Sequence, residues 1–387
     1  MRPARRTARY VAALLLALAG AAHGQLLIAA NSADNTLGVV NVLRSRTPWK
    51  ARPPTLLEDA DVVLAFGPRG RVAALSRGNG TISIANPHNL RPRLRIPFGR
   101  SSQLEDIAIS DGCTAYVTRR NATRLLRIDL CSGAARESVD LASFADADGI
   151  PDLGAMAVDR GRLFVQVRRY NAEGPFGTAP PAYLAVVDLA SETLVDCDPL
   201  TPGTQAIQLV GTAPKHRMQV VRDVVPSPPG AASSGQAGRE RTRLFVSASG
   251  GVFDAGGLEA VDLDRLASDG LVLREADGQT GADLGPFVMT SPEGGFLIFR
   301  TDLDLSSHLK RFTLRGGVEP GPEDYVTVGY AVPSLVHDAR AGAVFLVDGA
   351  VGNVGLHAFD ATSGRELSDG PAWPTAGRPT DLVLLGR

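Results

Sequence analysis

Apolar residues recur along most of the chain in short runs, and a turn containing glycine, aspartate or asparagine separates each run from the next. The clearest example is the stretch 106–133, DIAISDGCTAYVTRRNATRLLRIDLCSG. Its apolar positions alternate with polar ones, a period that is typical of β-strands and not of helices. The stretch therefore predicts three strands joined by tight turns, and the following residues 134–142 supply a fourth, outermost strand.

The same unit returns with a spacing of about 50 residues, close to the length of one four-stranded blade of a β-propeller. The first strands of the repeated units are expected to begin near residues 61, 106, 154, 216, 286 and 334. A Pro/Gly/Ser-rich stretch at about residues 226–243 interrupts one unit and is predicted to be an insertion loop. We therefore predict an all-β fold in a single domain that spans residues 25–387.

The two ends of the chain complete each other. Residues 26–42, LLIAANSADNTLGVVNV, look like the second and third strands of a unit that lacks its first strand. Residues 380–387, TDLVLLGR, look like a first strand with nothing after it. Pairing of these segments would close a ring and remove open sheet edges. A pair of open β-sandwiches is the alternative, but it would not explain why the two ends of the chain complement each other. We therefore predict a seven-bladed β-propeller with four-stranded blades, or six or eight blades if the unit near residue 216 is misread.

The N-terminal residues 1–24 have the order of a secretory signal peptide. Residues 1–10 carry four arginines and no acid, residues 11–22 are apolar, and Ala22-His23-Gly24 places small residues where a signal peptidase cleaves. We predict cleavage near Gly24 and a periplasmic or secreted protein, and an N-terminal core helix is the alternative. The rest of the chain has no apolar run of about 20 residues, so we predict no membrane span.

The charge balance argues against a nucleic-acid partner. The chain has 40 basic and 41 acidic residues and a formal net charge of −1, so no basic field is expected. Only Lys50, Lys215 and Lys310 among the basic residues are lysine. We attribute this preference for arginine to a GC-rich genome and not to an anion site.

The stretch from Leu104 to Leu130 resembles the repeat of bacterial YVTN-type β-propellers. The matching residues are the Asp111-Gly112 turn, the Tyr116-Val117-Thr118 strand and the Ile128-Asp129 strand end. The resemblance implies a propeller fold. It does not indicate a function, because propellers include enzymes, binding modules and scaffolds.

The cysteines predict one disulfide. If the turn of the second hairpin in the stretch 106–133 is centred on Ala122, Cys113 and Cys131 face each other across two antiparallel strands. Facing positions lie about 4.5–5.5 Å apart, within disulfide range, and export to an oxidising compartment favours the bond. Cys197 is left without a partner, either as a buried inert thiol or as a reactive or intermolecular one.

Carboxylates are expected to gather where the first strands begin, at one mouth of the central channel. Asp61, Asp106 and Asp381 take the same place at the start of three first strands, and His216 and His337 lie on two others. Further acids precede first strands, namely Glu58, Asp59, Glu105, Asp152 and Asp283. We predict a ring of acids that attracts a cation or a basic ligand, with the first five residues as ligand-binding candidates. The alternative is that the aspartates cap turns and stay solvated.

Asp146, Asp148 and Asp152 lie close together in the run DADGIPD. Carboxylates spaced in this way around a glycine turn can surround a hard cation such as Ca²⁺. The run resembles one unit of the calcium-binding thrombospondin type 3 repeats, with which it shares D-x-D-G-I-P-D. It occurs once, however, and Ala157 stands where an EF-hand would carry a glutamate. Two interpretations are therefore left: the three aspartates bind calcium, or the run is a plain loop between blades.

No complete catalytic motif is recognised. The sequence has no G-x-S-x-G element, P-loop or dinucleotide fingerprint, and the histidines after residue 24 are not spaced as metal ligands. The first functional hypothesis is therefore a non-catalytic, monomeric binding or scaffold protein for a protein, peptide or small ligand. The second is a lactonase-like or other hydrolase that uses channel carboxylates, with or without a divalent metal.

Overall fold

The computed structural model describes most of the chain after residue 24. The described residues are 25–30, 37–41, 50–52, 61–66, 71–86, 92–170, 182–225, 239–248, 256–275, 282–301, 306–319, 325–367 and 378–385. Three predicted features lie outside them: the signal peptide 1–24, the greater part (226–238) of the insertion, and the acids Glu58 and Asp59. In the described part, no helix is long and apolar enough to cross a membrane.

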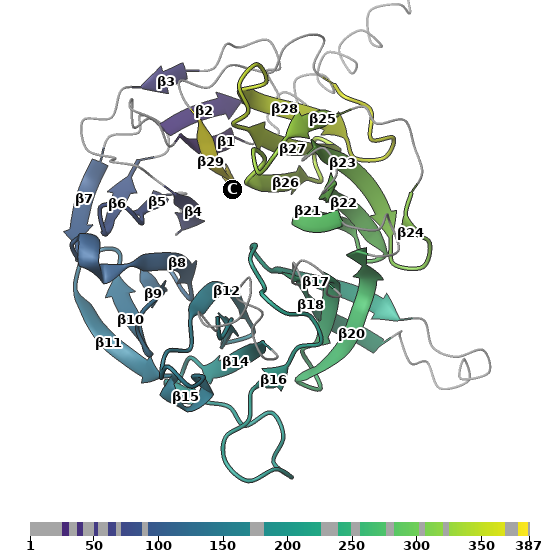
Figure 1. Cartoon of the computed structure of the whole chain (residues 1–387). Helices are drawn as coiled ribbons and strands as arrows, with labels where there is room; N and C mark the ends of the chain where they lie inside the picture. The colour runs from purple at the N-terminus through teal and green to yellow at the C-terminus, as the bar shows by residue number, and fades with distance from the viewer. Residues whose placement is uncertain are drawn as a thin grey trace, which may run out of the picture.

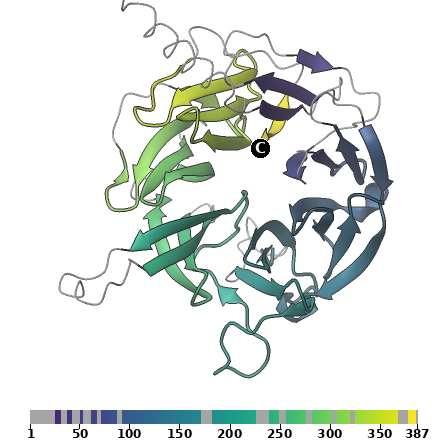
Figure 2. The ribbon, with the colours of Figure 1, turned by 180° about the vertical axis from the view of Figure 1, so that it is seen from behind.

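Nearly all regular structure in the described residues is β-strand. The exceptions are two short 3-10 helices, η1 (Arg100–Ser102) and η2 (Ala142–Phe144). The strands form seven sheets arranged around a central axis, which both ribbon views show (Figures 1 and 2). The chain is therefore an all-β propeller, as predicted.

We number the sheets from 1 to 7 around the ring and give the strands of each from the axis outward, with any extra strand last. Sheet 1 contains β29 (Pro379–Leu385), β1 (Gln25–Ala30), β2 (Leu37–Asn41) and β3 (Lys50–Arg52). Sheet 2 contains β4 (Val62–Phe66), β5 (Arg71–Ser76), β6 (Thr81–Ala85) and β7 (Pro92–Pro97). Sheet 3 contains β8 (Leu104–Ile109), β9 (Thr114–Arg119), β10 (Arg124–Asp129) and β11 (Ala135–Asp140). Sheet 4 contains β12 (Leu153–Asp159), β13 (Arg162–Val167), β14 (Tyr183–Asp188), β15 (Thr193–Leu194) and β16 (Ile207–Gln208).

Sheets 5 to 7 complete the ring. Sheet 5 contains β17 (Gln219–Val225), β18 (Arg239–Ala248), β19 (Gly257–Asp262) and β20 (Ala267–Arg274). Sheet 6 contains β21 (Ala282–Ser291), β22 (Gly294–Thr301), β23 (Ser306–Thr313), β24 (Gly317–Val318) and β25 (Val326–Val328). Sheet 7 contains β26 (Ser334–Asp338), β27 (Ala343–Asp348) and β28 (Gly355–Asp360). Among the described strands, four sheets have the predicted four strands, sheets 4 and 6 have five, and sheet 7 has three.

The two ends of the chain meet in sheet 1, as the sequence predicted. Strand β29 pairs antiparallel with β1, with Gln25 opposite Leu385 and Ile28 opposite Leu382. The innermost strand of each sheet contacts that of the next, in the order β29, β4, β8, β12, β17, β21, β26 and back to β29. The last strand of the chain therefore closes the ring.

The period of two along the strands places neighbouring side chains in different cores. On β9, Tyr116 packs between sheets 3 and 4, whereas the next residue, Val117, packs between sheets 2 and 3. Phe164 and Val165 on β13 are divided in the same way between the two sides of sheet 4. A strand that is buried on both faces needs apolar residues at consecutive positions, which explains the continuous apolar runs of the second strands.

Three boundaries differ from the prediction. Strand β21 begins at Ala282 and not near residue 286. Strand β18 begins at Arg239, so residues 239–243 belong to a strand and not to the insertion loop. The polar sequence of these residues did not indicate a strand, but a β-ladder uses only backbone groups. The charged side chains find partners on the neighbouring strand; for example, the Arg241 guanidinium lies 3.4 Å from the Asp262 carboxylate. His216 precedes β17, which begins at Gln219, so the prediction that His216 lies on a first strand was wrong.

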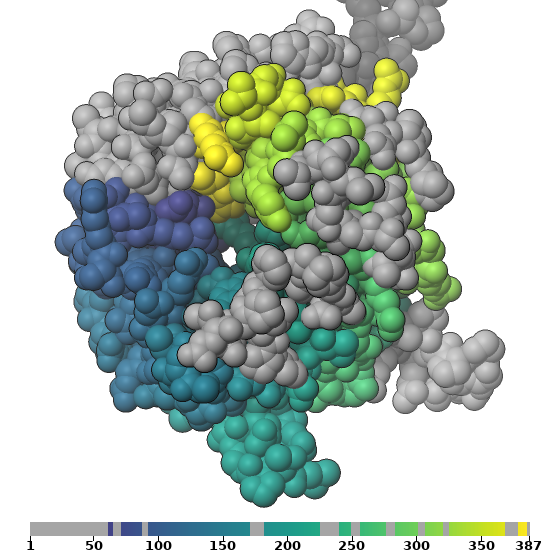
Figure 3. Space-filling model, viewed as in Figure 1, coloured from purple at the N-terminus to yellow at the C-terminus, as the bar shows by residue number. Residues whose placement is uncertain are grey.

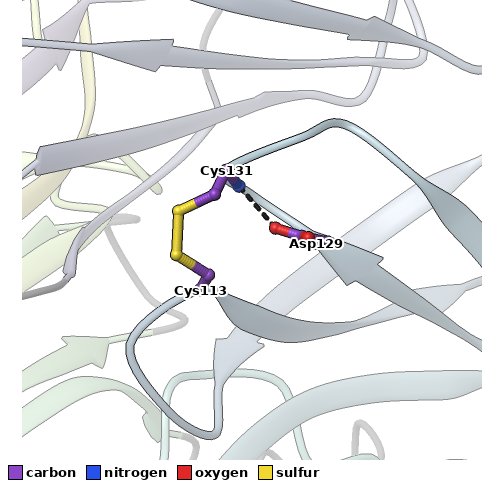
Figure 4. Close-up of side chains that lie close together, drawn as sticks. All are labelled: Cys113, Asp129 and Cys131. Atoms are coloured by element: carbon purple, nitrogen blue, oxygen red, sulfur yellow. Dashed lines mark hydrogen bonds between the residues drawn. A yellow bond between two sulfur atoms is a disulfide. The ribbon is translucent and has the colours of Figure 1, made fainter.

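The predicted disulfide between Cys113 and Cys131 is confirmed, with 5.6 Å between the two Cα atoms (Figure 4). The predicted register was wrong by one residue, because Thr114 lies opposite Asp129 and both cysteines lie just outside the ladder. Two aspartate turns bring them together. The Asp129 carboxylate accepts the Cys131 N–H at 2.7 Å, and the Asp111 carboxylate accepts the Cys113 N–H at 3.3 Å.

Replacing both bonded cysteines by serine is expected to lower the free energy of unfolding by about 2–4 kcal/mol, because the unfolded chain regains the freedom of the loop that the bond closes. Urea unfolding of the oxidised protein and of the Cys113→Ser/Cys131→Ser variant measures this difference. Cys197→Ser is the matched control and should cost clearly less. Equal stability of the double variant and the wild type without reductant would contradict a stabilising bond.

Candidate functional site

One face of the ring collects most of the described polar residues that were predicted at the channel. His337 is an exception, because it lies next to the end of β26 and opposite Val344 near the start of β27. Neighbouring strands are antiparallel, so the first strand of a sheet begins where its second strand ends; in sheet 3, Leu104 at the start of β8 lies opposite Arg119 at the end of β9. We call the face where the first strands begin the mouth face. A narrow opening is visible near the centre of the ring (Figure 3).

Two of the three predicted mouth aspartates are buried and hold adjacent sheets together. Asp381 and Asp106 are only 5% and 7% exposed. The Asp381 carboxylate of sheet 1 accepts the Val63 N–H of sheet 2 at 2.8 Å, and the Asp106 carboxylate of sheet 3 accepts the Met156 N–H of sheet 4 at 2.8 Å. These residues therefore do not form the open acidic ring that the sequence analysis expected. Ligand binding by them stays a prediction.

The same kind of contact recurs elsewhere with neutral side chains. Gln219 of sheet 5 accepts the Met289 N–H of sheet 6 at 2.7 Å and donates to the Met289 carbonyl at 3.2 Å. Side chains of second strands make similar contacts. Thr118 donates to the Gly154 carbonyl at 2.9 Å, and Ser247 donates to the Gly285 carbonyl at 3.2 Å. We call these side-chain-to-backbone contacts between consecutive sheets the inter-sheet clasps. They satisfy backbone groups that no ladder reaches.

Arg217 joins opposite sides of the ring. It belongs to the segment between β16 and β17, which reaches toward the middle of the ring (Figure 1). Its guanidinium donates to the Val63 carbonyl at 2.8 Å, to the Leu382 carbonyl at 3.2 Å and to the Asp381 carboxylate. Burial raises the pKa of Asp381, and the Arg217 charge opposes that rise. This arginine supplies the positive charge that a buried channel carboxylate requires.

The other three predicted mouth residues have separate environments. Asp61 is half-buried and accepts the backbone N–H of Arg77 at 2.6 Å. Burial, with the nearby Arg300 and Lys215 charges, lowers the pKa of His216 to about 3, and its Nε2 atom is buried without a hydrogen-bond partner. His337 on β26 is half-buried, and burial lowers its pKa while Asp338 opposes that effect. Both histidines are therefore neutral at pH 7.

Arginines at the ends of second strands are the mouth-face residues that the sequence analysis missed. Arg77, Arg120, Arg168 and Arg300 end or directly follow second strands in sheets 2, 3, 4 and 6. Each stands at the end of an apolar run, in ALSR, VTRR, VQVR and LIFR, so a recurring signal was present in the sequence. This signal was missed because the high arginine content was attributed to a GC-rich genome. The mouth face therefore alternates in charge and is not uniformly acidic.

Three of these arginines surround Glu105 at the start of β8. Arg168 lies 3.0 Å from Glu105 Oε1, whereas Arg120 and Arg77 lie 3.2 and 3.8 Å from Glu105 Oε2. Burial raises the pKa of Glu105, but the charges of the three arginines outweigh burial and lower the pKa below its usual value. Glu105 is therefore ionised at neutral pH.

A second mixed cluster lies at the start of sheet 6. Arg300 is 3.2 Å from the Asp283 carboxylate, and its guanidinium stacks 3.8 Å from the ring centre of the exposed Tyr330. Nearby, the Glu275 carboxylate accepts the Leu284 N–H at 3.0 Å and the Gly256 N–H at 3.1 Å. Burial, with the neighbouring Asp283 charge, raises the pKa of Glu275 to about 7. Asp283 was predicted to precede its first strand, but it is the second residue of β21 and is paired with Arg300.

The three aspartates of the predicted calcium loop accept backbone hydrogen bonds, two within the loop itself and one from the segment after β13. The Asp146 carboxylate accepts the Asp148 N–H at 3.2 Å, the Asp148 carboxylate accepts the Ile150 N–H at 2.7 Å, and the Asp152 carboxylate accepts the Tyr170 N–H at 2.8 Å. Burial and the neighbouring Asp148 raise the pKa of Asp146. As described, the loop does not gather three carboxylate oxygens within 4.8 Å of one another, so the calcium ligand set is not assembled.

The cysteines supply no metal or catalytic centre in the described residues. The one group of three potential ligands that lie within 4.8 Å of one another is Cys113, Asp129 and Cys131 (Figure 4), and its two sulfur atoms are used in the disulfide. Cys197 is half-buried, and burial raises the pKa of its thiol to about 11. A thiol with such a pKa is a poor nucleophile at neutral pH, which favours the inert alternative for Cys197.

The clasp role of Asp381 predicts a loss of stability. Asp381→Ala is expected to lower the free energy of unfolding by about 3 kcal/mol, because the buried Val63 N–H and the Arg217 guanidinium lose their partner. Urea unfolding measures the change. Asp61→Ala is the matched control and should cost about 1 kcal/mol, since Asp61 is only half-buried. The clasp role would be rejected if both variants unfolded at the same urea concentration.

If the 146–152 loop binds calcium, the dissociation constant is expected to be about 0.1–1 mM, because the three carboxylates must first be drawn together. Isothermal titration with CaCl₂ tests this expectation. Asp148→Asn should abolish the heat, and Asp140→Asn, which changes an exposed aspartate outside the loop, should leave it unchanged. Absence of saturable heat at about 10 mM CaCl₂ would contradict a calcium site.

The comparisons with known proteins support the fold. No family model and no curated protein matches the chain. A protein from Lactobacillus plantarum aligns with a TM-score of 0.57 and 12% identity, over 94% of this chain and 100% of the other. Dihydro-heme d1 dehydrogenase NirN in complex with DHE aligns with a TM-score of 0.52 and 13% identity, over 93% of this chain and 75% of the other. Apo AztD from Citrobacter koseri aligns with a TM-score of 0.50 and 12% identity, over 94% of this chain and 98% of the other. At these identities the likeness is one of fold alone, and the chain is similar to β-propeller structures.

Proposed function

We propose that this chain is an exported β-propeller that binds a protein, peptide or small molecule at its mouth face and does not itself catalyse a reaction. In this proposal each of sheets 1 to 7 is one blade, residues 1–24 are removed near Gly24, and the mature protein acts as a monomer in the periplasm or outside the cell. The disulfide between Cys113 and Cys131 supports an oxidising compartment.

The observation that carries the proposal is that some polar residues of the mouth face are buried and structural, whereas others are exposed to solvent. The buried acids Asp106 and Asp381 are used in inter-sheet clasps. Arg77, Arg120 and Tyr330, in contrast, are exposed just beyond strand ends of sheets 2, 3 and 6. A rigid backbone beneath these side chains loses little conformational freedom when a ligand binds. Such an arrangement favours recognition.

A hydrolase is the second candidate, and Glu275 is the observation that favours it. Its pKa of about 7 is suited to proton transfer at neutral pH, and it lies beside Asp283. Against this role, both carboxylate oxygens accept backbone N–H groups and the residue is 8% exposed. Its contacts are those of a structural acid, so binding remains the better-supported function.

A thermal-shift screen of a library of peptides and small molecules of positive, negative and zero charge tests the proposed function. At least one compound is expected to raise the melting temperature of the wild type by a few degrees, because a ligand that binds only the folded state stabilises it. Tyr330→Ala should reduce that shift. Arg315→Gln, a change at a fully exposed turn of sheet 6 away from the mouth face, should leave it unchanged.

Two results would count against the proposal. A ligand that stabilises the wild type, Tyr330→Ala, Arg77→Gln and Arg120→Gln equally would place binding away from the exposed residues of the mouth face. Turnover of a library compound, detected by mass spectrometry and abolished by Glu275→Gln, would favour the hydrolase instead.

A further inference from the structure

Arginines from three consecutive sheets converge on a single carboxylate at the mouth face. Arg77 of sheet 2, Arg120 of sheet 3 and Arg168 of sheet 4 all lie within 3.8 Å of the Glu105 carboxylate. Three guanidinium groups are positively charged at any physiological pH, and one carboxylate neutralises a single charge. The four side chains therefore carry a local charge of +2 in a protein whose formal net charge is −1.

The nearby aspartates are turned toward other partners. Asp61 directs one carboxylate oxygen to the backbone N–H of Arg77. Asp106 is buried and directs its carboxylate to the Met156 N–H of sheet 4. Their charges reduce the surrounding potential, but their hydrogen bonds do not use the exposed guanidinium nitrogens of Arg77 and Arg120.

The three arginines differ in what they can still bind. The Arg168 side chain is 6% exposed, and besides Glu105 it donates to the carbonyls of Asp152 and Leu153 at 3.2 and 3.0 Å, so it is a structural anchor. The side chains of Arg77 and Arg120 are 44% and 56% exposed. Arg77 donates through Nε to the Glu105 carbonyl at 3.0 Å, and its two terminal nitrogens make no hydrogen bond within the described part of the chain. Arg120 engages Glu105 through one terminal nitrogen.

The two exposed guanidinium groups are held side by side. Both approach the same oxygen, Glu105 Oε2, at 3.8 and 3.2 Å. Their backbones are also fixed, because Arg77 donates its N–H to Asp61 and Arg120 donates its N–H to the Gln103 carbonyl at 2.9 Å. Two adjacent guanidinium forks with unused donors match an anion that presents several oxygens in one plane or tetrahedron.

We propose that Arg77 and Arg120, positioned by Glu105, form an oxyanion subsite at the mouth face that recognises a carboxylate or phosphate group of the ligand. This inference rests on the proposed binding function and adds the chemical class of the ligand. It reverses the expectation of a cation or a basic ligand, because the side chains that remain exposed here are arginines and not aspartates.

Isothermal titration of the mature protein with sodium succinate, inorganic phosphate and the neutral analogue succinamide tests the subsite. Saturable binding is expected for at least one of the two anions and not for succinamide, and the stronger anion identifies which group the ligand carries. Affinity should fall as NaCl is raised, because the exposed arginines are screened by salt. Arg77→Gln and Arg120→Gln should each weaken anion binding about tenfold, as expected for the loss of one charge-assisted hydrogen bond.

Arg315→Gln is the matched control, because it removes the same charge from an exposed arginine outside the mouth face, and its anion affinity should stay within about twofold of the wild type. Equal melting temperatures of the variants show that all are folded. The subsite is overturned if neither anion binds at about 50 mM, if succinamide binds as well as succinate, or if both mouth variants bind like the wild type.

The test separates this inference from the proposed function. One outcome of the thermal-shift screen is a neutral or cationic ligand whose binding is abolished by Tyr330→Ala but unchanged in Arg77→Gln and Arg120→Gln. That result would contradict the oxyanion subsite and would still support the binding function. An anion that binds through the two arginines while no library compound depends on Tyr330 would support the subsite and move the ligand away from sheet 6.

Discussion

The pairing of β29 with β1 is the contact on which the rest of the structure depends. Each sheet buries its faces only against the sheets on either side, and Tyr116 and Val117 show how one strand serves two cores. An open row of sheets would expose one apolar face at each end. Because the C-terminal strand joins the N-terminal sheet, every sheet has a neighbour on both sides, and the ends of the chain are held by the same ladder.

Closing the ring creates a second requirement at its axis. The innermost strands carry backbone groups that face the next sheet without a ladder, and buried groups of this kind are costly unless they are hydrogen-bonded. The inter-sheet clasps of Asp106, Asp381 and Gln219 meet that need. Arg217 then balances the charge of Asp381 from the other side of the channel. The acids of the axis therefore stabilise the fold, and the proposed recognition is left to residues at the rim.

The strands, their order around the axis, the closure and the disulfide could all be predicted from the sequence. Each depends on a local pattern or on a repeat: the period of two predicts a strand, the repeated unit predicts the neighbours, and the incomplete units at the two ends predict that they pair. Details that depend on side-chain contacts were less accessible. The hairpin register was wrong by one residue, and the charged segment 239–243 was assigned to a loop although its backbone continues the ladder of β18.

The site divides in a corresponding way. The sequence by itself determined that acids gather where first strands begin, because that position recurs in each unit. Only the tertiary structure decided that Asp106 and Asp381 are buried and that Glu105 attracts arginines from sheets 2, 3 and 4. The physical reason is distance along the chain. Arg217 and Asp381 are separated by 164 residues, and partners of that kind meet only after the ring has closed.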